Sequence, residues 1–323
     1  MSDEPATRGG RATGAAGGER PAVSGSTSAE TATAALRATC WGTRGSIPSP
    51  GPDTARYGGN TACLEVRNAA GRCFILDGGT GIRALGDRLK RTDGSVHVDL
   101  FFTHFHWDHI QGIPFFAPLY DPGATIRIHG PRQDDAEIEK LFARQLESVF
   151  FPIPYDALAA RLEFSHLGDG PWRADDVEIE AMRVRHPSTT VGYRVRVGDA
   201  VLAYVPDNEL VGGSYPVDPD WYDRFLAFLD GVDLLFHDAM LTEAELPARE
   251  GWGHSTFRQT IRLARDAGVR RLRCFHHAPD RTDDELTRIV EMLREEADSV
   301  AGGGGAGPQI GIATEGETLE VEA

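Results

Sequence analysis

Short apolar segments that end at a histidine or an aspartate constrain the fold of this chain more than any other feature. Each segment is rich in β-branched or aromatic residues and is short enough for a strand. Polar side chains just past the ends of such strands can converge at one edge of a sheet. We therefore expect a single site built from several strand ends. The residues placed in this way are His104, His186, Asp207 and His276.

The densest group is the H-x-H-x-D-H run that directly follows Thr103. His104 and His106 are two residues apart, so they point the same way if the strand geometry continues. Asp108 and His109 follow where the chain must turn into the next element. Imidazole together with carboxylate suits Zn, Mn or Fe better than Ca or Mg. A solvated polar loop is the alternative, but the number and chemistry of these side chains favour adjacent metal ions.

Strand-like and helix-like segments fill the chain from Arg37 onward, separated by Gly, Pro and Asn. Their order is β-rich, then mixed, then β-rich, then alternating, and no long linker divides them. This order predicts one layered α/β domain, spanning residues 37–323, with its sheets inside. We expect strands at 63–66, 72–76, 97–103, 125–129, 177–185, 193–197, 201–205, 232–236, 272–275, 309–313 and 318–321. We expect helices at 82–89, 136–149, 221–229, 256–267 and 283–296.

Residues 1–36 have a different composition, dominated by Gly, Ala, Ser and Thr. A segment with so few large apolar residues cannot bury enough surface to offset the entropy lost on ordering. We expect a disordered tail that takes no part in the fold.

The charge, the cysteine content and the lack of long apolar segments argue against a nucleic-acid-binding, secreted or membrane-spanning protein. The chain has 33 Lys and Arg against 49 Asp and Glu, a net charge of −16, which repels phosphate backbones. The four cysteines form no C-x-x-C pair, and no secretory segment or long apolar run is present. We expect a cytoplasmic protein with reduced thiols and no association with a membrane.

The strand-end pattern and the H-x-H-x-D-H run together resemble the metallo-β-lactamase fold superfamily, from about Arg37 to the C-terminus. The resemblance implies an αββα sandwich with two divalent transition-metal ions between the sheets. Zn²⁺ is the first choice, with Mn²⁺ or Fe as alternatives. It implies one ion on His104, His106 and His186, a second on Asp108, His109 and His276, and Asp207 as the bridge.

Two assignments around these ligands rest on further detail of the sequence. Asp77, in L-D-G-G-T, matches the first acidic motif of the superfamily and would orient a ligand. Its alternative role is to form the turn before the glycines. His277 competes with His276 for the last ligand position, but the alternation along the preceding strand favours His276.

Two later motifs resemble the paired H-E-A-T and H-S-T segments of ribonuclease Z-like phosphodiesterases. They are H-D-A-M at 237–240 and G-H-S-T at 253–256. The resemblance implies that His254 approaches the scissile phosphate and that Asp238 orients it, with His237 just behind the site. Here Asp stands for Glu and Met for Thr, which puts the geometry of the pair in question. The serine and threonine after His254 also suit a helix N-cap.

The segment 115–160 stands where ribonuclease Z carries an arm that grips transfer RNA. Its part 134–147 reads as an ordinary acidic helix, which is a poor grip on RNA. With the net charge, this favours a small phosphodiester substrate, cyclic phosphates included, and argues against a large nucleic acid. The sequence also allows a homodimer.

The expected reaction is attack by a metal-activated hydroxide on phosphorus, with Asp108 orienting the hydroxide. His254, held by Asp238, would protonate the leaving group or stabilise charge. One alternative is an acyl hydrolase with the same metals, acting on a lactone, thioester or β-lactam. Another is a metal-bound sensor without turnover.

Deleting residues 2–35 is expected to leave folding and turnover intact, because this segment has almost nothing to bury. Thermal unfolding and kcat of the truncated chain check this prediction. A large drop in the melting temperature or in kcat would contradict it.

Overall fold

The computed structural model describes residues 34–322, apart from 92–93, 134–135, 168–169 and 301–306. Most of the expected tail lies outside the described residues, and Leu36 already begins the first strand. The strands form two seven-stranded sheets. In spatial order, the first sheet contains β14 (Thr318–Val321), β1 (Leu36–Gly42), β2 (Cys63–Asn68), β3 (Cys73–Leu76), β4 (His97–Phe101), β5 (Thr125–Gly130) and β6 (Arg161–His166). The second contains β13 (Gln309–Ile312), β12 (Arg271–Phe275), β11 (Leu234–Asp238), β10 (Ala200–Val205), β9 (Val191–Val197), β8 (Val177–Arg183) and β7 (Trp172–Ala174).

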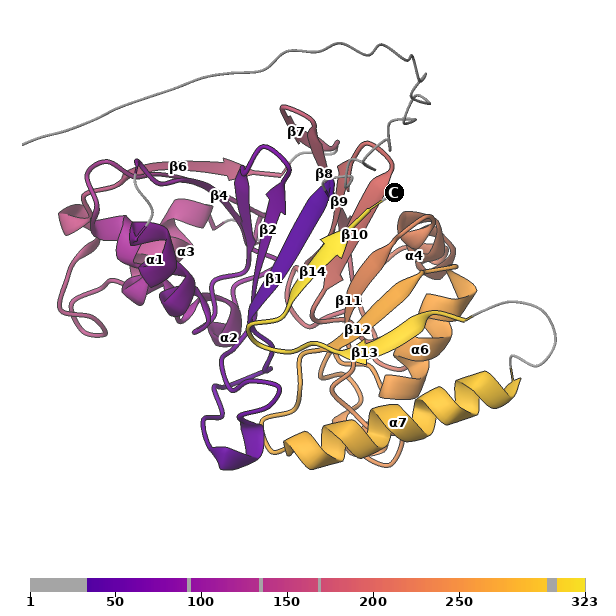
Figure 1. The fold of residues 1–323 in the computed structure, drawn as a ribbon. Coiled ribbons are helices and arrows are strands. Elements are labelled where there is room, and N and C mark those ends of the chain that lie inside the picture. The colour runs from indigo at the N-terminus through magenta and orange to yellow at the C-terminus, as the bar shows by residue number, and fades with distance from the viewer. Residues whose placement is uncertain (1–33, 92–93, 134–135, 168–169, 301–306, 323) are drawn as a thin grey trace, which may run out of the picture. The chain divides into compact units, whose positions relative to one another are not determined.

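Helices cover the outer face of each sheet (Figure 1). The first sheet packs against α1 (Ile82–Lys90) and α3 (Ile138–Arg144), the second against α4 (Trp221–Leu229), α6 (Phe257–Asp266) and α7 (Asp283–Val300). The remaining helical segments are α2 (Trp107–Ile110), α5 (Leu246–Arg249), η1 (Pro52–Thr54), η2 (Ile113–Phe115), η3 (Ala117–Tyr120) and η4 (Tyr155–Ala157). These layers confirm the predicted αββα sandwich.

The central strands are buried on both faces, so their residues alternate between two cores. Along β10, Leu202 and Tyr204 belong to the core between the sheets. Val201, Ala203 and Val205 belong to the core beneath the helices. Such strands read as continuous apolar runs, which is why the sequence pattern finds them.

Strand direction brings the ends of several strands to one edge of the sandwich. β10, β11 and β12 pair in parallel, and β8 also runs in their direction because β9 is antiparallel to both of its neighbours. In the first sheet, β3 and β4 are parallel as well. Carboxyl ends of parallel strands are where open α/β sheets place their sites. The residues at or just after these ends are Asp77, His104, His186, Asp207, Asp238 and His276.

Several boundaries differ from those expected. The sequence pattern does not indicate β1, β6 or β7; β1 starts inside the expected tail, and β7 has only 3 residues. The strand expected over 97–103 ends at Phe101, because the N–H of Thr103 leaves the sheet and donates to Asp77. The expected helix 136–149 is reduced to α3, since beyond it the backbone bonds shorten to i+3 turns.

All four cysteines are free and buried, as expected. Within the described ranges, no helix is long and apolar enough to cross a membrane.

Candidate metal centre

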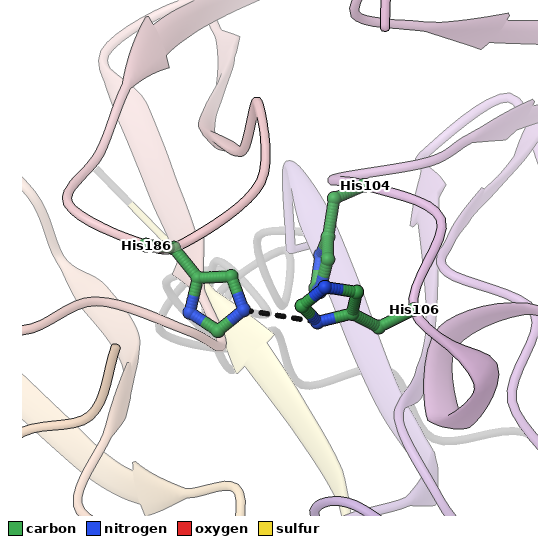
Figure 2. A group of neighbouring side chains, drawn as sticks. All are labelled: His104, His106 and His186. Atoms are coloured by element: carbon green, nitrogen blue, oxygen red, sulfur yellow. Dashed lines mark hydrogen bonds between the residues drawn. The ribbon is translucent and has the colours of Figure 1, made fainter. Parts of the chain in front are cut away.

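Three histidines from two sheets face one another at this edge (Figure 2). The Nε2 atom of His186 lies 3.1 Å from Nδ1 of His106. The ring centroid of His104 lies 4.5 Å from that of His106 and 4.9 Å from that of His186. His104 and His186 are buried, whereas His106 is exposed. The three rings each offer a nitrogen within 4.8 Å of the others, a spacing that one metal ion can bridge.

A second group lies beside the first. Nε2 of His276 is 3.0 Å from Oδ2 of Asp108, and Nε2 of His109 is 3.3 Å from the same oxygen. Asp207 lies between the two groups. Its carboxylate is 2.9 Å from Nε2 of His109, 3.3 Å from Nε2 of His276 and 4.0 Å from Nε2 of His186. The structure thus brings together every residue predicted as a ligand, in the two groups that the resemblance implies.

Buried atoms without partners test whether metal ions fit these groups. Among the described residues, Nε2 of His104 is buried and has no partner. Nε2 of His109 and Oδ2 of Asp207 are also buried, and they lie 2.9 Å apart without the geometry of a hydrogen bond. A buried polar atom left unpaired costs about 1–3 kcal/mol. Coordination to a cation would satisfy all three atoms, so these residues fit the metal that the fold implies.

The protonation states suit the same role. Burial lowers the pKa of His186 to about 4 and that of His104 well below its usual range, so both rings are neutral and can coordinate. Burial also raises the pKa of Asp207, but His276 and His109 outweigh it and hold that pKa well below its ordinary value. Neutral imidazoles such as these two, together with a carboxylate, are ligands that Zn²⁺ binds in proteins.

Asp77 fixes the orientation of two ligands. Its carboxylate accepts hydrogen bonds from the Thr103 N–H (2.7 Å) and the Tyr204 hydroxyl (3.1 Å), and lies 2.8 Å from Nδ1 of His109. The Thr103 hydroxyl lies 3.0 Å from Nδ1 of His104. Asp77 has a left-handed φ of 63°, a conformation that costs free energy and persists when surrounding contacts impose it. Thr103 and Tyr204 carry no signal in the sequence beyond their position on strands.

The structure places His276 at the cluster and turns His277 away from it. Nε2 of His277 bonds the carbonyl of Ala313 at 2.9 Å. His276 has a φ of 60°, which directs consecutive side chains to different places. Gly45 packs against the ring, and a Cβ atom there would lie 2.4 Å from Nδ1 of His276. Close backbone approach therefore requires glycine at this position.

His254 and Asp238 form a buried pair beside the cluster. Nδ1 of His254 lies 2.7 Å from Oδ2 of Asp238, and its ring stacks on His276 with centroids 5.0 Å apart. Burial lowers the pKa of His254, but the Asp238 carboxylate outweighs it and raises that pKa to about 9. The N–H groups of Met240 and Ser255 donate to the other oxygen of Asp238, at 3.0 and 3.3 Å. Aspartate thus reaches His254 despite being shorter than glutamate.

His237 lies behind this pair. Its Nδ1–H donates to the carbonyl of Asp238 at 2.8 Å, and its Nε2 accepts from the Asn208 amide at 3.2 Å. His237 therefore joins the loop after β10 to the end of β11. Thr256 caps α6, with Gln259 completing a capping box. The N-cap interpretation therefore holds for Thr256, two residues after His254.

Sequence reasoning misses Glu209, a fully buried carboxylate that fixes the loop before His254. It accepts hydrogen bonds from the N–H groups of Gly251 (3.0 Å) and Gly253 (2.9 Å), and from the hydroxyl of Tyr215 (2.5 Å). The carbonyl of Gly253 in turn accepts from Nδ1 of His186 at 3.1 Å. No motif marks Glu209, because its partners are backbone groups distant in sequence.

Residues 72–277 match the family described as the beta-lactamase superfamily domain. The chain belongs to this superfamily. The match confirms the predicted metallo-β-lactamase fold and the predicted class of metal-dependent hydrolase.

The chain is similar to ribonuclease Z of Haloferax volcanii, with 28% identity over 88% of this chain and 95% of the relative. It is also similar to ribonuclease Z of Porphyromonas gingivalis, with 23% identity over 76% of this chain and 90% of the relative. The metallo-beta-lactamase fold protein YhfI from Bacillus subtilis shares the fold, with a TM-score of 0.63 and 21% identity over 89% of this chain and all of that one. These relatives confirm the resemblance to the ribonuclease Z-like branch.

The expectation of a small phosphodiester, with a large nucleic acid argued against, is wrong. The relatives that contradict it are named ribonucleases, and they match over most of their length. A net charge of −16 is a property of the whole chain and does not describe the surface at one edge of the sheets. The acidic segment 134–147 likewise says only that RNA would not be held there, and residues 134–135 lie outside the described residues.

Gly253→Ala is expected to weaken zinc binding about 10- to 100-fold, the usual effect of disturbing a group behind a ligand. A Cβ atom at Gly253 would lie 2.0 Å from Nδ1 of His186. Isothermal titration with Zn²⁺ measures the effect. Gly251→Ala is the matched control, because it has the same left-handed backbone, with φ of 84° against 92°, but open space at Cβ. Equal losses in both variants would show that backbone strain, not His186, is responsible.

Proposed function

We propose that this chain is a dinuclear metal-dependent phosphodiesterase that acts on RNA. The observation that carries the proposal is the buried His254–Asp238 pair, which stacks against the candidate ligand His276. A site that only bound metal would have no need of a histidine held by a carboxylate at its margin. The RNA substrate is taken from the relatives named ribonuclease Z.

Two ions are proposed, with Zn²⁺ as the first choice for this set of nitrogen and oxygen donors. One would be held by His104, His106 and His186, the other by Asp108, His109 and His276, with Asp207 shared. When bound, such ions polarise the phosphoryl oxygens and lower the pKa of a water molecule to near neutrality.

Asp108 is the proposed group that orients the attacking water. Its side chain is 8% exposed, against 2% for Asp207, so it is the more accessible of the two carboxylates. The N–H of Ser46 donates to Oδ2 at 2.7 Å and fixes the carboxylate toward the cluster. This arrangement positions a proton acceptor without requiring the side chain to move.

His254 is the proposed proton donor to the leaving oxygen. Its Nδ1 is engaged by Asp238, so Nε2 is the atom left to transfer a proton. Since Asp238 raises the pKa of His254 to about 9, the ring carries its proton at neutral pH. General acid catalysis of this kind contributes about 10²- to 10⁴-fold.

The purified protein is expected to hold close to two transition-metal ions per chain. Asp207→Ala should lower that content, because the carboxylate lies within reach of both groups. Elemental analysis of the wild type and of the variant checks this. A single ion whose occupancy is unchanged by Asp207→Ala would rule out the shared site.

His254→Ala is expected to retain both metals and the fold but to lose about 10²- to 10⁴-fold in kcat on a phosphodiester with an alkoxide leaving group. The loss should shrink with p-nitrophenolate, which leaves without a proton. His106→Ala should lose metal and activity together, and Asp238→Ala should lose less than His254→Ala. Rates on both leaving groups and elemental analysis separate these effects.

If His254→Ala cleaved both phosphodiesters at the wild-type rate, the phosphodiesterase proposal would fail. Hydrolysis of a lactone, thioester or β-lactam with the same metals would then account better for the site.

A further inference from the structure

Two exposed tryptophans are close in sequence to residues of the site. Of the five tryptophans, Trp107 is 63% exposed and Trp252 is 58% exposed. Trp221, by contrast, is 5% exposed and donates from Nε1 to the carbonyl of Arg183 at 2.8 Å. Trp107 directly follows the ligand His106, and Trp252 lies two residues before His254. Large apolar groups left in water beside a polar site indicate a binding surface.

The backbone beneath each exposed ring is fixed. Trp107 begins α2, whose next residues, Asp108 and His109, are buried in the metal cluster. Trp252 lies between two glycines whose N–H groups both donate to the buried carboxylate of Glu209. Side chains that project from a rigid backbone lose little entropy when a ligand binds.

The site also opens toward solvent at this point. His106 is exposed, whereas the other candidate ligands are buried. A third loop contributes Ile47, which is 57% exposed and adjoins Ser46, the residue that donates to Asp108. Three loops that carry site residues thus also carry exposed apolar side chains.

Stacking on these side chains is one way for the chain to bind a polyanion such as RNA. The net charge of −16 gives the chain no overall attraction for phosphate, and it says nothing of the charge beside the site, so base contacts are a source of affinity that depends on neither. Stacking of bases on aromatic rings supplies about 1–3 kcal/mol per base and tolerates any sequence. Indole rings on rigid loops are suited to this form of binding.

We propose that Trp107 and Trp252 are stacking platforms for nucleobases on either side of the scissile phosphodiester. This inference rests on the proposed function for its substrate class. It assigns recognition to the bases of single-stranded RNA and leaves the phosphate to the metal centre.

The test compares a short oligoribonucleotide with a ribose-phosphate oligomer of equal length that lacks the bases. Both carry the same phosphates, so the ratio of their Kd values isolates the bases. Stopped-flow anisotropy with the zinc-loaded protein reads Kd before cleavage proceeds, and the same samples, quenched later, read cleavage.

The wild type should bind the oligoribonucleotide about tenfold or more tightly than the base-free oligomer. In the Trp107→Ala, Trp252→Ala double variant this ratio should fall to about one. Replacing both residues by Phe should largely restore it, since a phenyl ring still stacks. Tyr222→Ala, which removes an exposed aromatic residue of α4, should leave the ratio unchanged.

A ratio that stays at the wild-type value in the double Ala variant would overturn the stacking role. So would an equal loss of affinity for both oligomers, which would show that the tryptophans shape the site. Cleavage is read separately. A ratio that collapses as expected, in a protein that cleaves no RNA, would support the platforms while rejecting the proposed reaction.

Discussion

The burial of the Asp207 carboxylate is the constraint on which the site depends. It is only 2% exposed, and histidines of the cluster lie within 4.0 Å of its oxygens. Removing a charge from water costs several kcal/mol unless other charges and hydrogen bonds compensate. The imidazoles around it are buried as well, so protonating them all would add further buried charge. Cations shared between the carboxylate and the imidazoles would offset both costs.

The sandwich keeps that convergence rigid through buried carboxylates. Asp77 binds the turn after β4, Asp238 the loops after β11 and before α6, and Glu209 the loop that carries Gly253. In each case a carboxylate accepts backbone N–H groups from a segment distant in sequence. Loops that would otherwise be mobile are thereby held to the strand ends. The functional side chains lie on loops, and these hydrogen bonds hold the loops in fixed positions at the strand ends.

Much of this arrangement could be predicted from the sequence, because most candidate ligands directly follow a segment whose composition indicates a strand. The apolar runs indicate β4, β8, β10 and β12, and each is followed by a residue of the cluster. The preference for His276 over His277 also agrees with where the structure places them, although strand alternation gives no hint of the left-handed φ that separates them. Contacts made through space are different. From the sequence alone, Tyr204 resembles any other strand residue, Gly45 a turn residue and Glu209 an acidic residue on the surface. Their roles depend on partners that only folding supplies.

The prediction about partners failed for a related reason. Net charge is a sum over the chain, and the region that meets a substrate is a small part of it.

The candidate ligands come from opposite halves of the sandwich. His104, His106, Asp108 and His109 belong to the first sheet's connections, and His186, Asp207 and His276 to those of the second. An ion bound by ligands from both sets of connections would link the first sheet to the second. Its binding free energy would then enter the folding free energy directly, since the unfolded chain lacks the assembled ligands. Metal supply would therefore affect the stability of the folded protein as well as its activity.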